Sequence, residues 1–260
     1  MNGLSMHFYS VIKWPPAYAS TGFGDAEYSQ ILNKTLEMDQ LIRQHSAIMD
    51  KYDPQKRVGF YVDEWGAWYD VEPGTNPGFL FQQNTLRDAV LAGLNLNVFQ
   101  KHADRVRMTN IAQMINVLQA MVLTDKEKML VTPTYHVFEM YRPFKGAALL
   151  PAELSTPQYT NGDVSIPAVS VSAARRADGT LVLALVNTDP DTPARVTAKI
   201  AGAAARQISA RVLTAPQMNT HNTFDAPEAI KPAAFTGGKR RGDSWVFELP
   251  AKSVVVATLH

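Results

Sequence analysis

The 260-residue sequence contains no cysteine, which excludes disulfide bonds and metal sites built on thiolates. Its six histidines include neither an HExxH motif nor paired metal-ligand spacing, so we expect no zinc and no cofactor. No apolar run approaches the length of a membrane span. The 25 basic and 24 acidic residues give a formal net charge of only +1, so neither nucleic acid nor an anionic membrane is expected as a partner. What remains is a well-packed globular protein.

The first residues lack the charged and apolar regions of a signal peptide. Met1-Asn2-Gly3 leads directly into residues 4–9, an apolar segment typical of a buried strand. Because the chain opens inside a core strand, we expect that something upstream is missing. Localisation, whether cytoplasmic, secreted or periplasmic, stays open for the same reason.

Residues 59–70, GFYVDEWGAWYD, form the most informative segment. An apolar strand stops there at Asp63, Glu64 and Trp65, and strand alternation predicts that the two carboxylates point to opposite sides. One carboxylate among indole rings at a strand end is typical of glycosidases, because aromatic faces stack on sugars and a carboxylate stabilises an oxocarbenium ion. A capped acid with core tryptophans is the structural alternative.

Residues 1–142 alternate predicted strands with predicted helices, the latter over 25–50, 84–94 and 134–141. The segment 107–123 combines features of a helix and of a buried strand. This order favours parallel strands with right-handed crossovers, as in the last part of a (β/α)₈ barrel. The ends of two such strands carry His7-Phe8-Tyr9 and Glu64-Trp65, where barrel enzymes place functional groups.

From about residue 143 to residue 260 the pattern changes to short β-branched runs separated by turns. The predicted strands cover 164–171, 180–186, 195–200, 208–213, 245–249 and 253–259. Regular short strands of this kind favour an antiparallel β-sandwich. We expect this half to pack against the barrel part, with a carbohydrate-binding module as the alternative. The basic run 239–241 is predicted to be a solvated loop.

Four segments carry a family resemblance: LSMHFYS (4–10), YVDEWGAWYD (61–70), ADRVRMTNIAQMINVLQAM (103–121) and MNTHNTFDAPEAIKP (218–232). Together they resemble the C-terminal half of glycoside hydrolase family 51, which consists mainly of α-L-arabinofuranosidases. The resemblance implies the last three strands of a (β/α)₈ barrel followed by a jelly-roll-like β-sandwich. It also implies retaining hydrolysis of terminal α-L-arabinofuranosyl residues of arabinan and arabinoxylan.

The same resemblance assigns site residues. Glu64 matches the catalytic nucleophile, and Tyr9 matches a tyrosine that hydrogen-bonds and orients it. The remaining matches are candidates for binding the sugar: His7, Trp68, Gln113 and Trp65. For Trp65, support of the packing is the favoured role. Asn116 is either a site residue or a polar cap, and Asp63 is expected on the far face, bonded to backbone or to a basic side chain.

The family's acid/base glutamate follows Gly-Asn, and no GNE string occurs in this sequence. Other glutamates fit the role poorly: Glu27, Glu37, Glu72, Glu127, Glu139 and Glu153. Only Glu72, in the loop after Glu64, is placed to reach the pocket. We therefore expect a fragment that is inactive alone, or that depends on the missing N-terminal half or on a homo-oligomer such as the family's hexamers.

Two other functions stay open from the sequence. One is a different retaining specificity on the same scaffold, such as a xylosidase or endoglucanase. The other is a noncatalytic carbohydrate-binding remnant of an enzyme. A furanose subsite that rejects pyranosides distinguishes the expected function from the first, and glycan binding without hydrolysis identifies the second.

Overall fold

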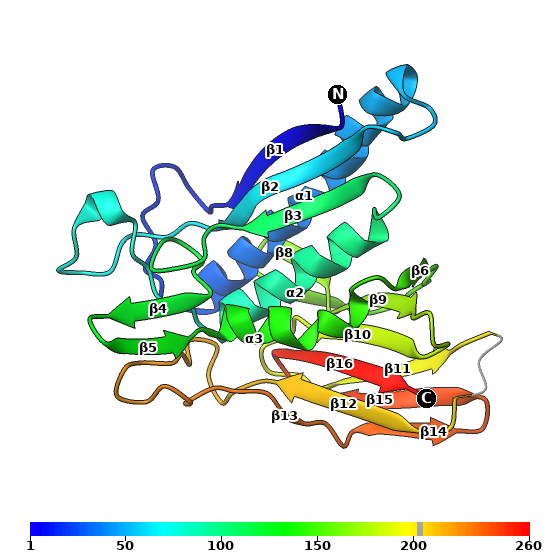
Figure 1. Ribbon diagram of the computed structural model, residues 1–260. Coiled ribbons are helices and arrows are strands. Elements are labelled where there is room, and N and C mark those ends of the chain that lie inside the picture. The colour runs from blue at the N-terminus through cyan, green and yellow to red at the C-terminus, as the bar shows by residue number, and fades with distance from the viewer. Residues whose placement is uncertain (202–204) are drawn as a thin grey trace.

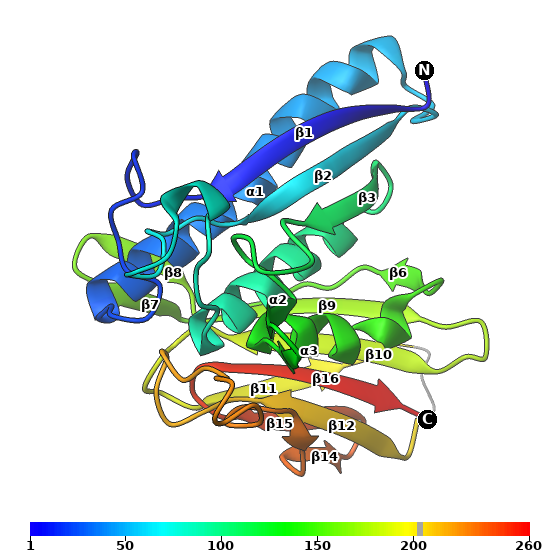
Figure 2. The ribbon, with the colours of Figure 1, turned by 60° about the vertical axis from the view of Figure 1, so that its left-hand side comes forward.

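The computed structural model describes residues 1–201 and 205–260. Its N-terminal part is built on a parallel sheet in the order β1-β2-β3 (Gly3–Ser10, Gly59–Ala67, Val106–Ile111). The connections run through α1 (Asp25–Tyr52) and α2 (Leu86–Lys101). Both helices lie on the same side of the sheet, between it and the β-rich half of the molecule (Figures 1 and 2). The other face of the sheet carries no helix of the described chain.

Two antiparallel sheets form the β-rich half. The six-stranded sheet has the order β13-β12-β16-β10-β9-β6, and the three-stranded sheet the order β11-β15-β14. The bounds of these strands are β6 Ala148–Leu150, β9 Val169–Arg175, β10 Leu181–Asn187, β11 Ala194–Lys199, β12 Ile208–Leu213, β13 Ala233–Ala234, β14 Gly238–Arg241, β15 Ser244–Leu249 and β16 Ser253–Leu259. Figure 1 shows the two sheets stacked as a sandwich below α2 and α3.

Smaller elements join these layers. Two hairpins pair β4 (Val122–Asp125) with β5 (Lys128–Val131) and β7 (Gln158–Asn161) with β8 (Val164–Pro167). The short helix α3 (Pro133–Met140) follows β5, and two 3₁₀ turns, η1 (Pro77–Phe79) and η2 (Arg142–Phe144), lie in loops. In the described part of the chain, no helix is both long and apolar enough to cross a bilayer.

Local chemistry explains where the helices begin. The side chain of Glu27 accepts a hydrogen bond from the Gly24 backbone N–H at 2.9 Å, which closes the first turn of α1. Asp88 does the same for the Thr85 N–H at 2.7 Å at the start of α2. The third helix, α3, opens on Pro133, whose missing N–H is not needed in the first turn.

The six-stranded sheet is a wall shared by two hydrophobic cores. Along β10, the alternate residues Val182 and Val186 pack with the helices and the parallel sheet, whereas Leu183 and Leu185 pack into the sandwich. The adjacent strand β16 divides in the same way. All seven residues of β10 are buried as a result. The two halves of the chain therefore have no solvent layer between them.

The expected fold class, the last barrel strands followed by an antiparallel sandwich, is confirmed. Three local expectations were wrong. The segment 107–123 contains no helix, because it forms β3 and then a loop leading to β4. The helix expected over 84–94 continues to Lys101. The basic run 239–241 belongs to the edge strand β14, whose side chains are exposed, so its polar sequence hid its strand conformation.

Candidate active site

The parallel pairing of β1 with β2 brings the predicted site residues together. His7 lies opposite Glu64 in the register, and Tyr9 lies opposite Gly66. His7 and Tyr9 share one face of β1, because side chains two residues apart on a strand point the same way. That face is directed away from α1 and α2, whereas Phe8 packs toward the hydrophobic core.

A β-bulge in β2 decides how the two carboxylates point. Three steps along β2, from Tyr61 to Glu64, match two steps along β1, and the pairing with β3 shifts at the same place. Val62 and Trp65 are both buried in the helix-side core. The two residues between them, Asp63 and Glu64, therefore both face the opposite side.

The imidazole of His7 lies between these two carboxylates. Its Nδ1 is 3.1 Å from Glu64 Oε2, and its Nε2 is 3.4 Å from Asp63 Oδ1. The expectation that Asp63 and Glu64 point to opposite sides, with Asp63 on the far face, was wrong because the bulge interrupts the alternation. Asp63 does contact a basic side chain, as expected, but that side chain is His7 of the site itself.

Tyr9 donates a hydrogen bond from its hydroxyl to Glu64 Oε1. Partial burial raises the pKa of Tyr9 well above its usual value, and the hydrogen bond to the Glu64 carboxylate and its negative charge raise it further. The phenol therefore stays protonated and remains a donor over the whole physiological pH range. With His7 at one oxygen of Glu64 and Tyr9 at the other, the carboxylate is held in one orientation.

Asp63 carries a stable negative charge beside this pair. Ser5 donates its hydroxyl to Asp63 Oδ1 at 2.7 Å. This hydrogen bond, and to a lesser extent the charge of His7, lowers the pKa of the Asp63 carboxyl below its ordinary value. No local sequence pattern indicated that Asp63 and Ser5 belong to the same cluster as Glu64.

Aromatic rings border the cluster on one side. The ring of Trp68 meets the ring of Tyr9 edge-on at a centroid distance of 5.1 Å, and the ring of Trp14 meets Trp68 in the same way at 5.2 Å. Trp14 is 60% exposed, in the loop that follows β1. Sequence reasoning missed this residue, although its position after the strand that carries His7 and Tyr9 was a usable signal.

Trp65 belongs to the core and not to the sugar-facing surface. Its side chain is 0% exposed, stacks on Phe138 and meets Phe99 edge-on. The structure therefore supports its favoured role in packing and contradicts direct contact with a sugar. Because Trp65 is buried on the helix side of β2, its neighbour Glu64 points to the opposite face.

The loop after β3 carries two glutamines with different surroundings. Gln113 is exposed, and its role as a sugar ligand stays a prediction. Gln119 is buried, accepts a hydrogen bond from the Ala67 N–H at 2.7 Å and donates one to the Asp88 carbonyl at 3.1 Å. It thereby fixes the C-terminal end of β2, a role that the sequence did not reveal. Asn116 bonds Thr124 through both its amide and its carbonyl group, as a polar cap does.

Glu72 was the remaining candidate for a second catalytic carboxyl in this chain. It accepts hydrogen bonds from the Ser20 hydroxyl and, at 3.1 Å, from the Gln83 backbone N–H. Through these contacts Glu72 links the loop that contains Ser20 to the loop that contains Gln83. Within the described residues, no group of three or more histidine or acidic side chains is arranged to hold a metal ion.

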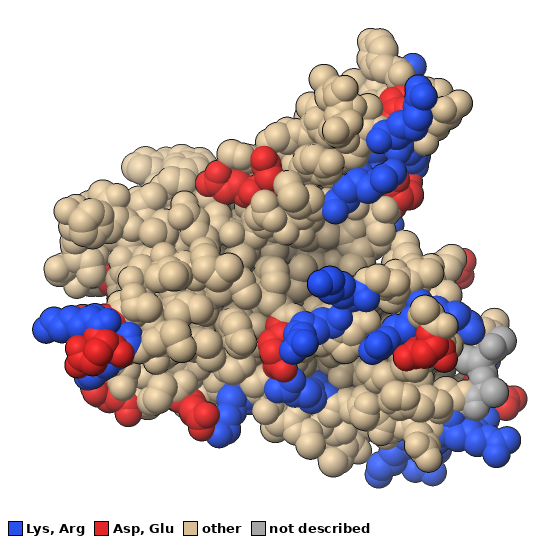
Figure 3. All heavy atoms as spheres, in the orientation of Figure 1, with Lys and Arg blue, Asp and Glu red and all other residues tan. Residues whose placement is uncertain are grey.

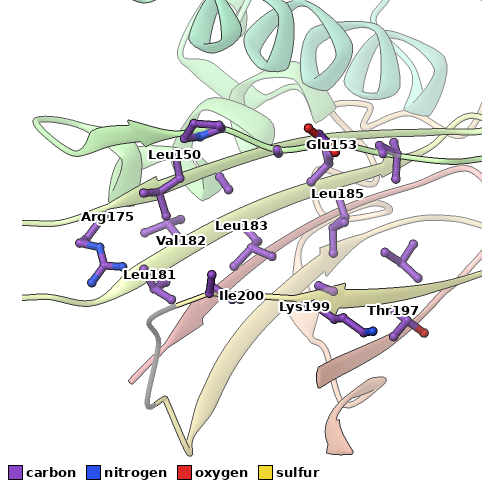
Figure 4. A pocket seen from close by; sticks show the side chains of 18 residues that line it. Leu150, Glu153, Arg175, Leu181, Val182, Leu183, Leu185, Thr197, Lys199 and Ile200 are labelled. Carbon is purple, nitrogen blue, oxygen red and sulfur yellow. The ribbon is translucent and has the colours of Figure 1, made fainter. Parts of the chain in front are cut away.

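The sandwich contains a cavity of about 490 Å³ between β9, β10 and β11 (Figure 4). Aliphatic side chains such as Leu150, Leu183 and Ile200 line it, with Arg175 and Lys199 among the charged ones. No aromatic ring of the described residues contributes to its lining. Since sugar recognition by sandwich modules relies on aromatic stacking, this cavity does not favour the carbohydrate-binding alternative.

Comparison with known proteins gives a consistent result. The sequence profile of the family described as "Alpha-L-arabinofuranosidase C-terminal domain" matches residues 63–253. An intracellular exo-α-L-arabinofuranosidase of Bacteroides ovatus is 41% identical over 262 residues, which cover 100% of this chain and 51% of that protein. An intracellular exo-α-(1→5)-L-arabinofuranosidase of Halalkalibacterium halodurans is 29% identical, over 60% of this chain and 34% of that protein.

Solved structures agree with these sequence matches. The crystal structure of a GH51 arabinofuranosidase from Xanthomonas axonopodis pv. citri superposes with a TM-score of 0.99 at 52% identity, over 100% of this chain and 53% of that one. A family 51 α-L-arabinofuranosidase from Bifidobacterium longum shares the fold, with a TM-score of 0.83 at 24% identity over 100% of this chain and 53% of that one. The chain thus spans about half the length of these relatives.

Proposed function

This chain belongs to the α-L-arabinofuranosidases of glycoside hydrolase family 51, and from that premise we propose that it supplies the nucleophile half of a retaining arabinofuranosidase site. The proposed substrate is a glycan with terminal α-L-arabinofuranosyl residues, as in arabinan and arabinoxylan. The observation that carries the proposal is the Glu64 carboxylate, which His7 and Tyr9 hold through its two oxygens.

In this proposal Glu64 attacks the anomeric carbon of the arabinofuranosyl residue while the bond from that carbon to the leaving-group oxygen breaks. The covalent glycosyl-enzyme intermediate that results is then hydrolysed by water. The attack needs a carboxylate in a fixed orientation, and the contacts of Tyr9 and His7 with its two oxygens hold Glu64 in one. Trp68, with Trp14 beside it, provides an apolar wall against which a sugar ring packs. Gln113 is proposed to contact the sugar hydroxyls from the loop after β3.

Retention of configuration requires a second carboxyl about 5–5.5 Å from the nucleophile to act as acid and then as base. The resemblance assigns no residue of this chain to that role, and Glu72 is engaged by other groups. We propose that this carboxyl comes from outside the 260 residues. Activity is then expected only when a partner segment completes the pocket.

The test is hydrolysis of an aryl α-L-arabinofuranoside by the chain alone and by its mixture with the N-terminal half of a family member. An activated phenolate leaving group needs little protonation, so the assay mainly reports on Glu64. We expect activity in the mixture, a loss of at least a thousandfold in Glu64→Gln, and no change in Glu127→Gln, which alters an exposed turn between β4 and β5.

Activity of the chain alone would contradict the need for a partner segment to complete the pocket. Equal activity of the Glu64→Gln mixture would contradict the nucleophile assignment. Faster hydrolysis of an aryl xylopyranoside than of the arabinofuranoside would favour a xylosidase on the same scaffold, the alternative left open by the sequence.

A further inference from the structure

A second candidate site lies away from the Glu64 cluster, on the helix-facing side of the six-stranded sheet. There, beyond the C-terminal end of α3, a hollow of about 900 Å³ opens between the η2 turn and strands β12 and β16. In Figure 3, Lys and Arg side chains border this part of the surface, over α3 and β12 as seen in Figure 1. The hollow shares no residue with the proposed catalytic cluster.

The charge of this hollow is strongly positive. Four basic side chains line it, Arg142, Lys145, Arg176 and Arg211, against the single carboxylate of Glu139. Four positive charges less one negative charge leave +3, whereas the whole chain carries only +1. The local excess therefore does not follow from overall composition.

Only part of this charge is neutralised by ion pairs. Arg211 donates to both oxygens of Glu139 at 2.7 Å, which satisfies that carboxylate. Arg176 lies 3.7 Å from Asp178 in a loose, exposed pair. Arg142 and Lys145, by contrast, form no ion pair with any residue that the structure describes. Both are free to meet an incoming anion.

The floor of the hollow adds hydroxyl groups. Ser209 on β12 and Thr258 on β16 are opposite each other in the antiparallel register and point to the same face. Pro143 and Val256 contribute small apolar patches beside them. A ligand in the hollow thus meets cationic donors at the rim and hydroxyl and C–H surface below, a combination that suits a charged sugar.

The dimensions and chemistry discriminate between anions. A volume of about 900 Å³ exceeds that needed for a single phosphate and falls in the upper range of small-molecule pockets, roughly 300–1,000 Å³. Among the residues that the structure describes, no aromatic side chain lines the hollow for stacking of nucleic-acid bases. Arginine binds carboxylates through paired hydrogen bonds, and lysine adds a point charge.

We propose that this hollow binds a carboxylate-bearing oligosaccharide, a chain of uronic acid units, through Arg142, Lys145, Arg176 and Arg211. The saccharide part of the proposal rests on the proposed function, whereas the anionic part rests on the charge of the hollow alone. Such a site would hold the chain near acidic polysaccharide that carries neutral arabinofuranosyl branches.

The experiment is isothermal titration of the purified chain at low ionic strength with three probes: trigalacturonate, neutral arabinotriose and inorganic phosphate. We expect trigalacturonate to bind at least tenfold more tightly than either of the others, with an affinity that falls as NaCl is added. The double variant Arg142→Gln/Lys145→Gln should lose at least tenfold in affinity. The matched control is Arg240→Gln/Arg241→Gln, which removes two exposed cations from β14 and should leave the affinity within twofold.

Tight binding of phosphate with the same loss in the double variant would overturn the saccharide part and leave a simple anion site. Equal binding of arabinotriose, or no binding of trigalacturonate at 10-fold excess over millimolar protein, would overturn the proposal entirely. An equal loss in the β14 control would show nonspecific attraction and overturn it as well. Because the titration involves no hydrolysis, failure of the Glu64 assay with intact trigalacturonate binding would refute the proposed function without refuting the anion site.

Discussion

Asp63 lies within reach of the same imidazole that contacts Glu64, so its charge acts on the candidate nucleophile through His7. Because its pKa is lowered, chiefly by the Ser5 hydroxyl, it stays ionised across the neutral range. The Asp63 carboxylate at Nε2 holds the imidazole ring with its Nδ1 toward Glu64. Asp63 is thus a positioning residue in this arrangement and not a second nucleophile.

We predict that Asp63→Asn lowers hydrolysis by the reconstituted mixture about three- to tenfold, mainly in kcat. The amide keeps the shape and the hydrogen bond from Ser5 but removes the charge, and partial exposure of both groups limits the effect. Steady-state kinetics with the aryl arabinofuranoside measure it, with Asp125→Asn at the exposed end of β4 as the control. An unchanged kcat in Asp63→Asn would show that His7 is positioned without Asp63.

The sequence allowed Glu64, Tyr9 and His7 to be predicted as neighbours because each lies toward the C-terminal end of a parallel strand, β1 or β2, and such ends converge. It misassigned Asp63 because strand alternation is a rule for regular pairing, and a bulge is set by neighbours distant in the chain. The contact of Trp14 with Trp68 was not predicted, because a loop residue has no periodic pattern from which its neighbours can be inferred.

Among the elements, α2 is the one that the rest of the molecule surrounds. It begins at a capping box, packs against the parallel sheet on one side and meets β10 and β16 on the other. It approaches the six-stranded sheet closely at Gly93, where an added Cβ would lie 2.9 Å from Val186 Cγ2 and 3.3 Å from Val254 Cγ2. Both valines are β-branched, so they have little freedom to move aside.

We predict that Gly93→Val destabilises the chain by about 2–3 kcal/mol, since overpacking of a tight interface outweighs the gain in helix propensity. Urea unfolding followed by circular dichroism measures the change. Gly22→Ala is the control, because its added Cβ meets only Ala19 Cβ at 3.7 Å and should change stability little. Equal stabilities of the two variants would mean that α2 can shift away from the sheet at low cost.

Elements with a strong period were predictable, and polar or short ones were not. The strands β12 and β16 were predicted with the bounds that the structure has. In β12, apolar residues that face the sandwich alternate with polar ones, and in β16 apolar residues alternate between the two cores. The helix α1 was predicted to within two residues of its end at Tyr52. The strand β14 was missed because an edge strand with Lys239, Arg240 and Arg241 contributes nothing apolar for a pattern to detect.

Folding buries several tyrosines across the molecule and opposes their ionisation. Burial raises the pKa of Tyr28, Tyr69 and Tyr141 well above the ordinary value of 10.0. Burial also raises the pKa of Tyr159 to about 12. In the unfolded chain these phenols titrate near 10, so their contribution to stability is complete below pH 10 and is lost as pH rises toward their folded values.

We predict that the free energy of unfolding falls steeply above pH 10, by about 1.4 kcal/mol per pH unit for each fully buried tyrosine. Urea melts at pH 8, 10 and 11 measure the slope. Tyr141→Phe should reduce this slope by one proton equivalent. At neutral pH the same variant should lower the free energy of unfolding by about 1 kcal/mol, because it loses the 2.9 Å hydrogen bond to Asn97 Oδ1. Tyr52→Phe, at an 85% exposed position, should leave the slope unchanged.

Because the six-stranded sheet contributes to both hydrophobic cores, it limits how the two halves of the chain can change in evolution. Neighbouring residues on β10 pack against different partners. A change in the size of Val182 alters packing against the helices, whereas a change in Leu183 alters packing inside the sandwich. If the β-rich half were exchanged without α2, the helix-side valines of β10 and β16 would meet a foreign partner. The β-rich half is therefore expected to be passed on with its own α2 and to diverge in step with it, whereas the exposed loops and β14 are free to vary separately.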